Sequence, residues 1–134
     1  MKLEPYLHFA GNCEEALEAY AKIFRGEIVE ANRYGGSPME AQAPPDWGNK
    51  IMHATFRAPG VDLMAGDSTH ASAIGAGGRI TLAVATEDSA EGERIFQALA
   101  EGGNVTMPYA KQFWGASFGM LTDRFGVDWM VNAG

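Results

Sequence analysis

The stretch GVDLM at residues 60–64 returns as GVDWM at residues 126–130. Upstream of these two stretches stand Asn12 and Asp88, and both are residue types favoured at helix N-caps. Each is followed three positions later by a glutamate, which is the spacing of a capping box. The chain therefore contains an internal repeat, and its two halves are expected to share one fold.

The hydrophobic periodicity predicts the elements of each half. Apolar side chains recur at three- and four-residue steps after Asn12 and after Asp88, as on one face of a helix. We expect Gly26 to end the first helix in the left-handed conformation and Gly102-Gly103 to end the second. Strands are predicted at residues 4–10, 27–34, 51–58 and 61–67 in the first half, and at 79–86, 105–110, 116–122 and 127–132 in the second. The predicted unit is βαβββ, used twice.

The first half is longer than the second, and the extra length falls at residues 35–49, which are rich in Gly and Pro. We predict a long loop there, and a candidate lid. The chain is predicted to be a single α+β domain, residues 1–134, with modules 1–67 and 79–134 and a linker at 68–78. A βαβββ unit covers only one face of its sheet, so two units side by side are expected to form a curved mixed sheet with a cleft.

Composition limits the function classes. The chain has 134 residues, a net charge of −7, 46% hydrophobic residues and one Cys. The hydrophobic content disfavours a disordered chain, and the negative charge without a basic cluster disfavours nucleic acid and anionic membranes. A single cysteine excludes a disulfide framework and multi-cysteine zinc sites. We find neither a membrane-spanning apolar run nor a secretory signal, so a cytoplasmic location is expected.

Several motifs resemble one known family. They are PYLHF at 5–9, EEAL at 14–17, MHA at 52–54, GGNVTMP at 102–108, FWGA at 113–116 and FGMLTDRFGVDW at 118–129. These stretches resemble the vicinal oxygen chelate superfamily of glyoxalases, bleomycin resistance proteins and extradiol dioxygenases, and most closely its PhnB-like branch. The resemblance implies the fold of tandem βαβββ modules and a homodimer. The branch often carries the description of a methyltransferase, but the glycine cluster at 74–78 precedes a predicted strand and does not fit a methyl-donor site.

The resemblance also implies where a divalent metal would be held, on the first and last strands of the modules. Counted from the helix caps and the GVD turns, these positions are occupied by Pro5, Thr81, Met64 and Met130. Proline offers no donor, threonine is a weak ligand and thioethers prefer soft ions. We therefore expect no metal and no other cofactor, although a one-residue bulge would replace Pro5 by another side chain.

Three histidines are candidates for chemistry. The offset that relates Asn12 to Asp88 pairs His8 with Val84, which predicts a packed position beneath the helix, and a pocket role is the alternative. His53 lies in an apolar strand; it is either a structural histidine or, if it faces the cleft, the best catalytic acid or base, because imidazole titrates near neutral pH. His70 lies in the predicted linker and is expected to be solvated.

The remaining candidates suggest a ligand-binding surface. We expect the cleft to be lined by Leu7, Thr81, Met64, Trp114 and Met130, with the Trp114 indole stacking on a planar ligand. The leading hypothesis is a protein that binds a small organic molecule in this apolar cleft without the usual metal. The alternatives are a divalent-metal-dependent lyase, isomerase or dioxygenase using His8 and His53, and a structural dimer with a vestigial cavity.

Overall fold

The computed structural model describes residues 1–69 and 80–134, which fall into two compact units, residues 1–75 and 76–134. The elements of the first unit are β1 (Tyr6–Phe9), α1 (Cys13–Phe24), β2 (Glu27–Arg33), the 3₁₀ turn η1 (Glu40–Gln42), β3 (Ile51–Ala58) and β4 (Val61–Asp67). Those of the second are β5 (Leu82–Thr86), α2 (Ser89–Ala100), β6 (Asn104–Lys111), β7 (Ser117–Thr122) and β8 (Asp128–Ala133). The βαβββ order predicted for both halves is confirmed.

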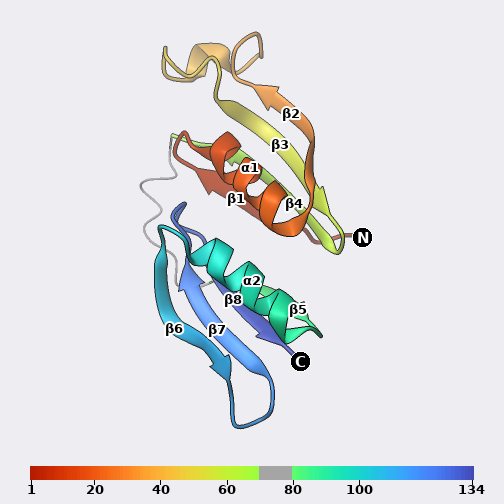
Figure 1. Cartoon of the computed structure of the whole chain (residues 1–134). Helices are drawn as coiled ribbons and strands as arrows, with labels where there is room; N and C mark the ends of the chain where they lie inside the picture. The colour runs from red at the N-terminus through yellow and green to blue at the C-terminus, as the bar shows by residue number, and fades with distance from the viewer. Residues whose placement is uncertain (70–79) are drawn as a thin grey trace. The chain divides into compact units, whose positions relative to one another are not determined.

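Each unit is a four-stranded mixed sheet with one helix on one face (Figure 1). The strand orders are β1-β4-β3-β2 and β5-β8-β7-β6. In both sheets the first and last strands of the unit pair in parallel and the other pairs are antiparallel. The fold class is therefore α+β with tandem βαβββ modules, as the repeat predicts.

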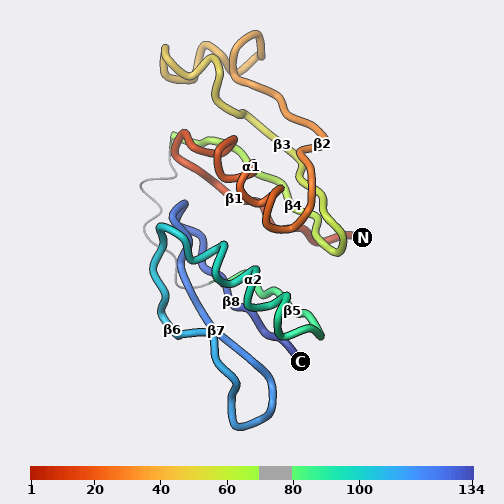
Figure 2. Tube along the Cα trace, viewed as in Figure 1, coloured from red at the N-terminus to blue at the C-terminus, as the bar shows by residue number. Residues whose placement is uncertain are grey.

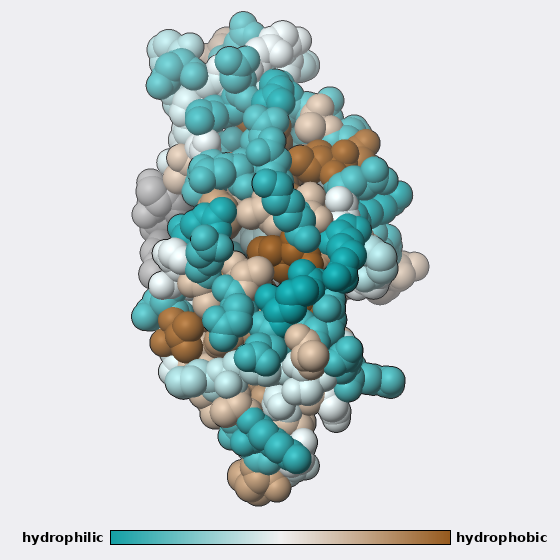
Figure 3. Space-filling view, in the orientation of Figure 1, coloured by the Kyte–Doolittle hydropathy of each residue, from teal (hydrophilic) through white to brown (hydrophobic). Residues whose placement is uncertain are grey.

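The core of each unit lies between its helix and its sheet. In unit 1, Leu17 and Tyr20 of α1 and Phe56 of β3 are buried in the core. In unit 2, Phe96 and Leu99 of α2 are buried in the equivalent place. The outer surfaces over both helices are mostly hydrophilic (Figure 3), as expected for helices that bury a single stripe. Because each helix covers only one face, the other face of each sheet is free to carry functional side chains.

The two helices begin differently. Asp88 caps α2 as predicted, because its Oδ1 accepts hydrogen bonds from the backbone N–H groups of Ala90 (2.9 Å) and Glu91 (3.4 Å). Asn12 occupies the N-cap position of α1 as predicted, but its side chain makes no cap hydrogen bond, so the predicted capping box is absent there. Asp67, at the end of β4, takes this role: its Oδ1 accepts from the N–H groups of Gly11 and Cys13, both at 2.9 Å. A carboxylate distant in the sequence has replaced the local cap.

The end of α1 also differs from the prediction. Arg25, not Gly26, adopts the left-handed conformation, with φ 55° and ψ 50°. Gly26 is required for another reason: a Cβ there would lie 2.6 Å from the carbonyl oxygen of Arg57. The glycine therefore allows the start of β2 to approach β3 closely, and the backbone turn is made by the residue before it.

The long segment between β2 and β3 is a loop, as predicted, interrupted only by the short turn η1, and Figure 2 traces it beyond the ends of both strands. Residues 70–78 of the predicted linker, with His70 and the glycine cluster at 74–78, lie outside the described residues. Within the described ranges, no helix has the length and apolar character needed to cross a membrane.

Candidate functional site

We call the sheet face opposite the helix the open face of each unit. Paired residues on neighbouring strands project to the same face, and successive residues to opposite faces. Leu7 pairs with Ala65, which is fully buried, whereas Tyr6 pairs with Met64, which is half-buried. Tyr6 and Met64 therefore lie on the open face of unit 1, and Leu7 lies on the side of α1, on the face opposite Met64.

The open face of unit 1 carries a cluster of three rings, Tyr6, His8 and His53. The Tyr6 ring contacts both imidazoles, with ring-centroid distances of 4.9 Å to His8 and 5.6 Å to His53. Tyr6 Oη and His53 Nδ1 are hydrogen-bonded at 3.2 Å. His53 is half-buried, so it combines a fixed position with access from the open face.

The prediction that His8 packs beneath the helix is wrong, because His8 is exposed. In the sheet register His8 pairs with Gly66 and Ala85 pairs with Asn132. The equivalent of His8 is therefore Ala85, one position beyond the Val84 that the offset between the helices gives. Unit 1 has one more residue between its first strand and its helix, and a slip of one residue in a strand changes the face of every side chain.

The open face of unit 2 is apolar. Met120 of β7 pairs with Met107 of β6 on one side and with Met130 of β8 on the other, so three thioethers form a row across three strands. All three methionines are half-buried, and Ala83 of β5 continues the row beside Met130. We call Met107, Met120 and Met130 the methionine row.

Trp114 lies in the β6–β7 loop, at the edge of this surface. Its ring meets that of Phe118 edge-on at a centroid distance of 6.3 Å and that of Phe113 at 4.9 Å. Phe118 is two positions before Met120 in β7 and so shares its face. Trp114 remains 53% exposed, which leaves its indole accessible to a ligand. Thr81 lies immediately before β5 and is half-buried.

The side chains beside the two last-strand methionines do not form a set of hard metal ligands. The first-strand partner of Met64 is Tyr6 instead of Pro5, and that of Met130 is Ala83 instead of Thr81. These four paired side chains supply a phenol, a methyl group and two thioethers. Over residues 1–69 and 80–134, no three His, Cys, Asp or Glu side chains come together in a metal-binding group.

The buried acidic groups of both units have structural roles. Asp67 Oδ2 accepts a hydrogen bond from the Ile51 N–H at 3.0 Å, in addition to the two bonds that its Oδ1 accepts at the start of α1. Asp123 accepts hydrogen bonds from the N–H groups of Phe125 and Val127 and from Trp129 Nε1, so it stabilises the turn before β8. Neither carboxylate is placed to act on a ligand.

Cys13 is also inert. It is fully buried at the start of α1, and burial, with smaller contributions from the carboxylates of Asp67 and Glu14, raises the pKa of its thiol to about 12. A thiol with such a pKa is protonated at neutral pH and is a poor nucleophile. Cys13 therefore has a packing role at the start of α1.

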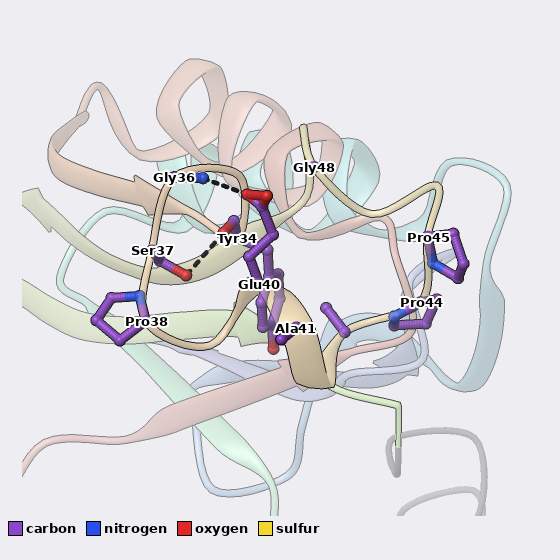
Figure 4. Close-up of a pocket in the computed structure, with 10 residues that line it drawn as sticks. Tyr34, Gly36, Ser37, Pro38, Glu40, Ala41, Pro44, Pro45 and Gly48 are labelled. Atoms are coloured by element: carbon purple, nitrogen blue, oxygen red, sulfur yellow. Dashed lines mark hydrogen bonds between the residues drawn. The ribbon is translucent and has the colours of Figure 1, made fainter.

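The loop at 35–49 lines an open cavity of about 700 Å³ (Figure 4). Its only carboxylate, that of Glu40, already accepts a hydrogen bond from the Gly36 N–H at 2.5 Å, and the Ser37 hydroxyl donates to the Tyr34 carbonyl oxygen at 2.7 Å. The cavity contains none of the predicted site residues. We therefore place the candidate site on the open faces, where the side chains with useful chemistry lie, and not in this cavity.

Sequence reasoning missed Tyr6, Phe118 and two members of the methionine row. The alternation of side chains along β8 assigns faces to Trp129 and Met130 but to no residue of β7. The sequence does not show which residues of neighbouring strands pair. Phe118 and Met120 could have been assigned to one face from their spacing alone. Met107 could not, because the β6–β7 register shifts between Val105 and Met107.

A family model described as 3-demethylubiquinone-9 3-methyltransferase matches residues 1–132. The protein YjdN of Escherichia coli is 35% identical over 98% of this chain and 95% of its own. The crystal structure of PA1353 from Pseudomonas aeruginosa is 44% identical, covers 99% of this chain and 97% of its own, and superposes with a TM-score of 0.86.

A Bacillus cereus protein described as a putative 3-demethylubiquinone-9 3-methyltransferase and as PhnB covers all of both chains at 29% identity and a TM-score of 0.81. At 10% identity, a glyoxalase/bleomycin resistance protein/dioxygenase family enzyme from Burkholderia phytofirmans has a TM-score of 0.62 over 96% of this chain and 95% of its own. This last likeness shows the fold alone.

Proposed function

The chain belongs to the PhnB-like branch of the vicinal oxygen chelate superfamily, and from that premise we propose that it binds a small organic molecule, without a metal ion, against its apolar open face. The observation that carries this proposal is the methionine row, three thioethers in register across β6, β7 and β8 with the Trp114–Phe118 pair at their edge. This surface would form the apolar wall of the cleft predicted from the sequence.

The chemistry of these side chains favours an apolar, partly flat ligand. Methionine is unbranched and polarizable, so a row of methionines adapts to irregular shapes and makes favourable contacts between sulfur and aromatic rings. The exposed indole of Trp114 adds a stacking surface and one N–H donor. Covering a methionine side chain completely is worth roughly 1.5–3 kcal/mol, so a ligand that covers even part of the row gains useful affinity.

The proposal of metal-free binding rests on the donor set. The phenol of Tyr6 and the thioethers of Met64 and Met130 replace the imidazoles and carboxylates that Zn²⁺, Mn²⁺ or Fe²⁺ would need. The ligand itself would then be recognised by shape and by a few hydrogen bonds, as in most small-molecule sites.

Fluorescence of Trp114 tests the proposal. We would titrate 1-naphthol, cyclohexanol and a panel of similar molecules into the Trp47→Phe variant, which removes one competing indole, and follow quenching and thermal stability. A binder from this panel is expected to lose about tenfold in affinity in Met120→Ser, because one face of the site becomes polar. Met39→Ser, the same change in the loop at 35–49 and outside the open faces, is the matched control. Absence of any response across the panel would favour a structural dimer with a vestigial cavity.

A second candidate function is a divalent-metal-dependent lyase, isomerase or dioxygenase. The observation in its favour is that His8 and His53 both contact the Tyr6 ring. Elemental analysis of protein purified without chelators, with thermal shifts on addition of Zn²⁺, Ni²⁺, Mn²⁺ or Fe²⁺, distinguishes it. One equivalent of metal, lost in His53→Ala, would give this function the lead.

A homodimer remains part of the proposal, because the family often pairs its chains to complete the binding site. Light scattering coupled to size-exclusion chromatography measures the mass directly. A mass of about twice 14.4 kDa is expected, and a monomer at all concentrations would remove the dimer from the proposal.

A further inference from the structure

We propose that Tyr6 is a positioning residue for His53: it holds the imidazole in the tautomer that carries its proton on Nε2, so that His53 presents an N–H donor from the open face of unit 1 to an acceptor oxygen of the ligand. The inference deepens the proposed function, on which its ligand part rests. It predicts the class of ligand that the open face of unit 1 accepts, an organic molecule bearing a carbonyl or carboxylate oxygen.

The backbone leaves a space for the Tyr6 hydroxyl. A Cβ placed on Gly66 would lie 2.8 Å from Tyr6 Oη and 2.7 Å from the carbonyl oxygen of Met52. Any other residue at this position of β4 would therefore displace the hydroxyl from the surface of the sheet. Because Gly66 has no side chain, Tyr6 on β1 reaches across β4 to His53 on β3.

The direction of the hydrogen bond follows from the two groups. A phenol is a good donor, and the unprotonated nitrogen of a neutral imidazole is a good acceptor. Burial raises the pKa of the Tyr6 hydroxyl above its ordinary value, with smaller contributions from Cys13 and Tyr34, so the hydroxyl keeps its proton. Tyr6 therefore donates to Nδ1 of the neutral ring, and the ring proton must reside on Nε2.

The described surroundings of His53 leave Nε2 for an outside partner. Asn32, the strand neighbour of His53 on β2, uses its amide to donate to Glu30 Oε1 at 3.2 Å. His8 contacts the Tyr6 ring through its own ring, at a centroid distance of 4.9 Å. His8 thus serves as an internal control, because it is an imidazole beside the same tyrosine whose hydroxyl is directed to His53.

This arrangement also bears on the metal alternative. A metal ion binds a nitrogen lone pair, and in the tautomer held by Tyr6 the accessible Nε2 carries a proton instead. Metal binding through Nε2 would require the hydrogen bond to reverse, with Nδ1–H donating to the phenol oxygen, which is the weaker acceptor. The same geometry therefore favours an organic acceptor over an ion.

The test reads the tautomer directly. Long-range ¹H–¹⁵N spectra of protein with ¹⁵N-labelled imidazoles, recorded at a pH where the rings are neutral, assign the protonated nitrogen of His53 and His8. In Tyr6→Phe the ratio of the Nε2–H to the Nδ1–H tautomer of His53 is expected to fall about fivefold, the factor that the loss of one ordinary hydrogen bond gives. The tautomer ratio of His8 should stay unchanged. An unchanged ratio for His53, or a dominant Nδ1–H form in the original protein, would overturn the inference.

Ligand binding tests the second half of the inference. We would compare acetophenone and benzoate, one neutral and one anionic acceptor, with ethylbenzene, which has no acceptor. The acceptor ligands are expected to lose five- to tenfold in affinity in His53→Leu and to regain part of it in His53→Gln, which restores an N–H donor. Ethylbenzene should be indifferent to both changes. A change of tautomer without this pattern would keep Tyr6 as the positioning residue and overturn the donor role, whereas failure of all three probes to bind the original protein would count against the proposed function itself.

Discussion

The starts of the two helices show how two units of the same topology differ in chemistry. Cys13, the first residue of α1, is fully buried, and its N–H donates to Asp67 at the far end of β4. Ser89, the first residue of α2, is exposed, and its cap is the adjacent Asp88. At the position equivalent to Asp67, counted from the GVD turn of each half, unit 2 has the buried Ala133. Unit 1 therefore joins its helix to its sheet through a buried carboxylate, and unit 2 does so through apolar packing and a local cap.

The open faces differ in the same way. Unit 1 presents phenol and imidazole groups in Tyr6, His8 and His53, whereas unit 2 presents the methionine row and the ring of Phe118. A duplicated fold has thus been used for two kinds of surface, one that can direct hydrogen bonds and one that can cover apolar area. The difference lies in the side chains alone, because the two units share one topology.

The largest expected effect of a substitution is that of Asp67→Ala. Three backbone N–H groups, those of Gly11, Cys13 and Ile51, would lose their acceptor in a buried place. Each buried unsatisfied donor costs about 1–3 kcal/mol, and water entering the space offsets part of this, so we expect a loss of roughly 3–5 kcal/mol in the free energy of unfolding. Urea denaturation followed by circular dichroism measures it.

Ala133→Ser is a control for Asp67→Ala, because it alters the equivalent position of unit 2 without removing an acceptor. Asp67→Asn keeps one acceptor oxygen and should fall between Asp67→Ala and the original protein. If Asp67→Ala costs no more than the loss of a surface cap, the contrast between a buried and a local helix start is wrong.

The second prediction concerns the thiol at the start of α1. Cys13 is the equivalent of the exposed Ser89, and its full burial predicts that a thiol reagent labels the native protein at least about a hundredfold more slowly than the unfolded protein. Its pKa rises on folding from an ordinary 9.0 to about 12. The stability that the protonated thiol contributes is therefore fully present below pH 9 and is lost as the pH rises towards 12.

Labelling by 5,5′-dithiobis(2-nitrobenzoate) at pH 8, with and without urea, measures the protection. Cys13→Ser removes the thiol and is expected to flatten the fall in stability above pH 9 without removing that of the tyrosines and lysines. Rapid labelling under native conditions would show that the start of α1 opens as readily as an exposed helix end.

The third prediction concerns the glycines where each helix gives way to its next strand. A Cβ on Gly26 would lie 2.6 Å from the carbonyl oxygen of Arg57, and a Cβ on Gly103 would lie closer still to that of Thr122. Both contacts are with backbone, which cannot move aside cheaply, so Gly26→Ala and Gly103→Ala are each expected to destabilise by about 1–3 kcal/mol. Here the two units should behave alike.

Gly48→Ala is the matched control for these glycine substitutions, because a Cβ at Gly48 meets nothing within 4 Å. Its effect on the urea midpoint should lie within experimental error. A strong effect at Gly26 and none at Gly103 would mean that the two units do not share this close approach.

The topology could be predicted from the sequence because it depends on repeated local signals. The helix periodicity, the Asp88 cap and the two GVD turns are all short-range features, and they define the βαβββ order without knowledge of the sheet. The extra length between β2 and β3 was likewise readable, because glycine and proline mark it as a loop.

Much of the candidate site could not be predicted, because it depends on register. The single extra residue between β1 and α1 reversed the expected face of His8 and placed Leu7 on the side of the helix. The hydrogen bond from Tyr6 to His53 crosses an intervening strand at Gly66, and the methionine row depends on a bulge in β6. None of these long-range pairings is encoded in a local pattern.

The smallest expected effects on stability are those of substitutions at the two N-cap positions, Asp88 and Asn12. Asp88→Ala removes a side-chain acceptor from the N–H groups of Ala90 and Glu91 and is expected to cost about 1 kcal/mol, the ordinary value of an N-cap. Asn12→Ala should cost less than about 0.5 kcal/mol, because the Asn12 side chain makes no cap hydrogen bond and Asp67 already serves the start of α1. The same denaturation curves measure both. Sequence alone predicts equal costs for the two substitutions, because both residues have the capping-box spacing. A larger cost for Asp88→Ala than for Asn12→Ala would show that the carboxylate of Asp67 accounts for the difference between the units. Equal costs would show that Asn12 does cap α1.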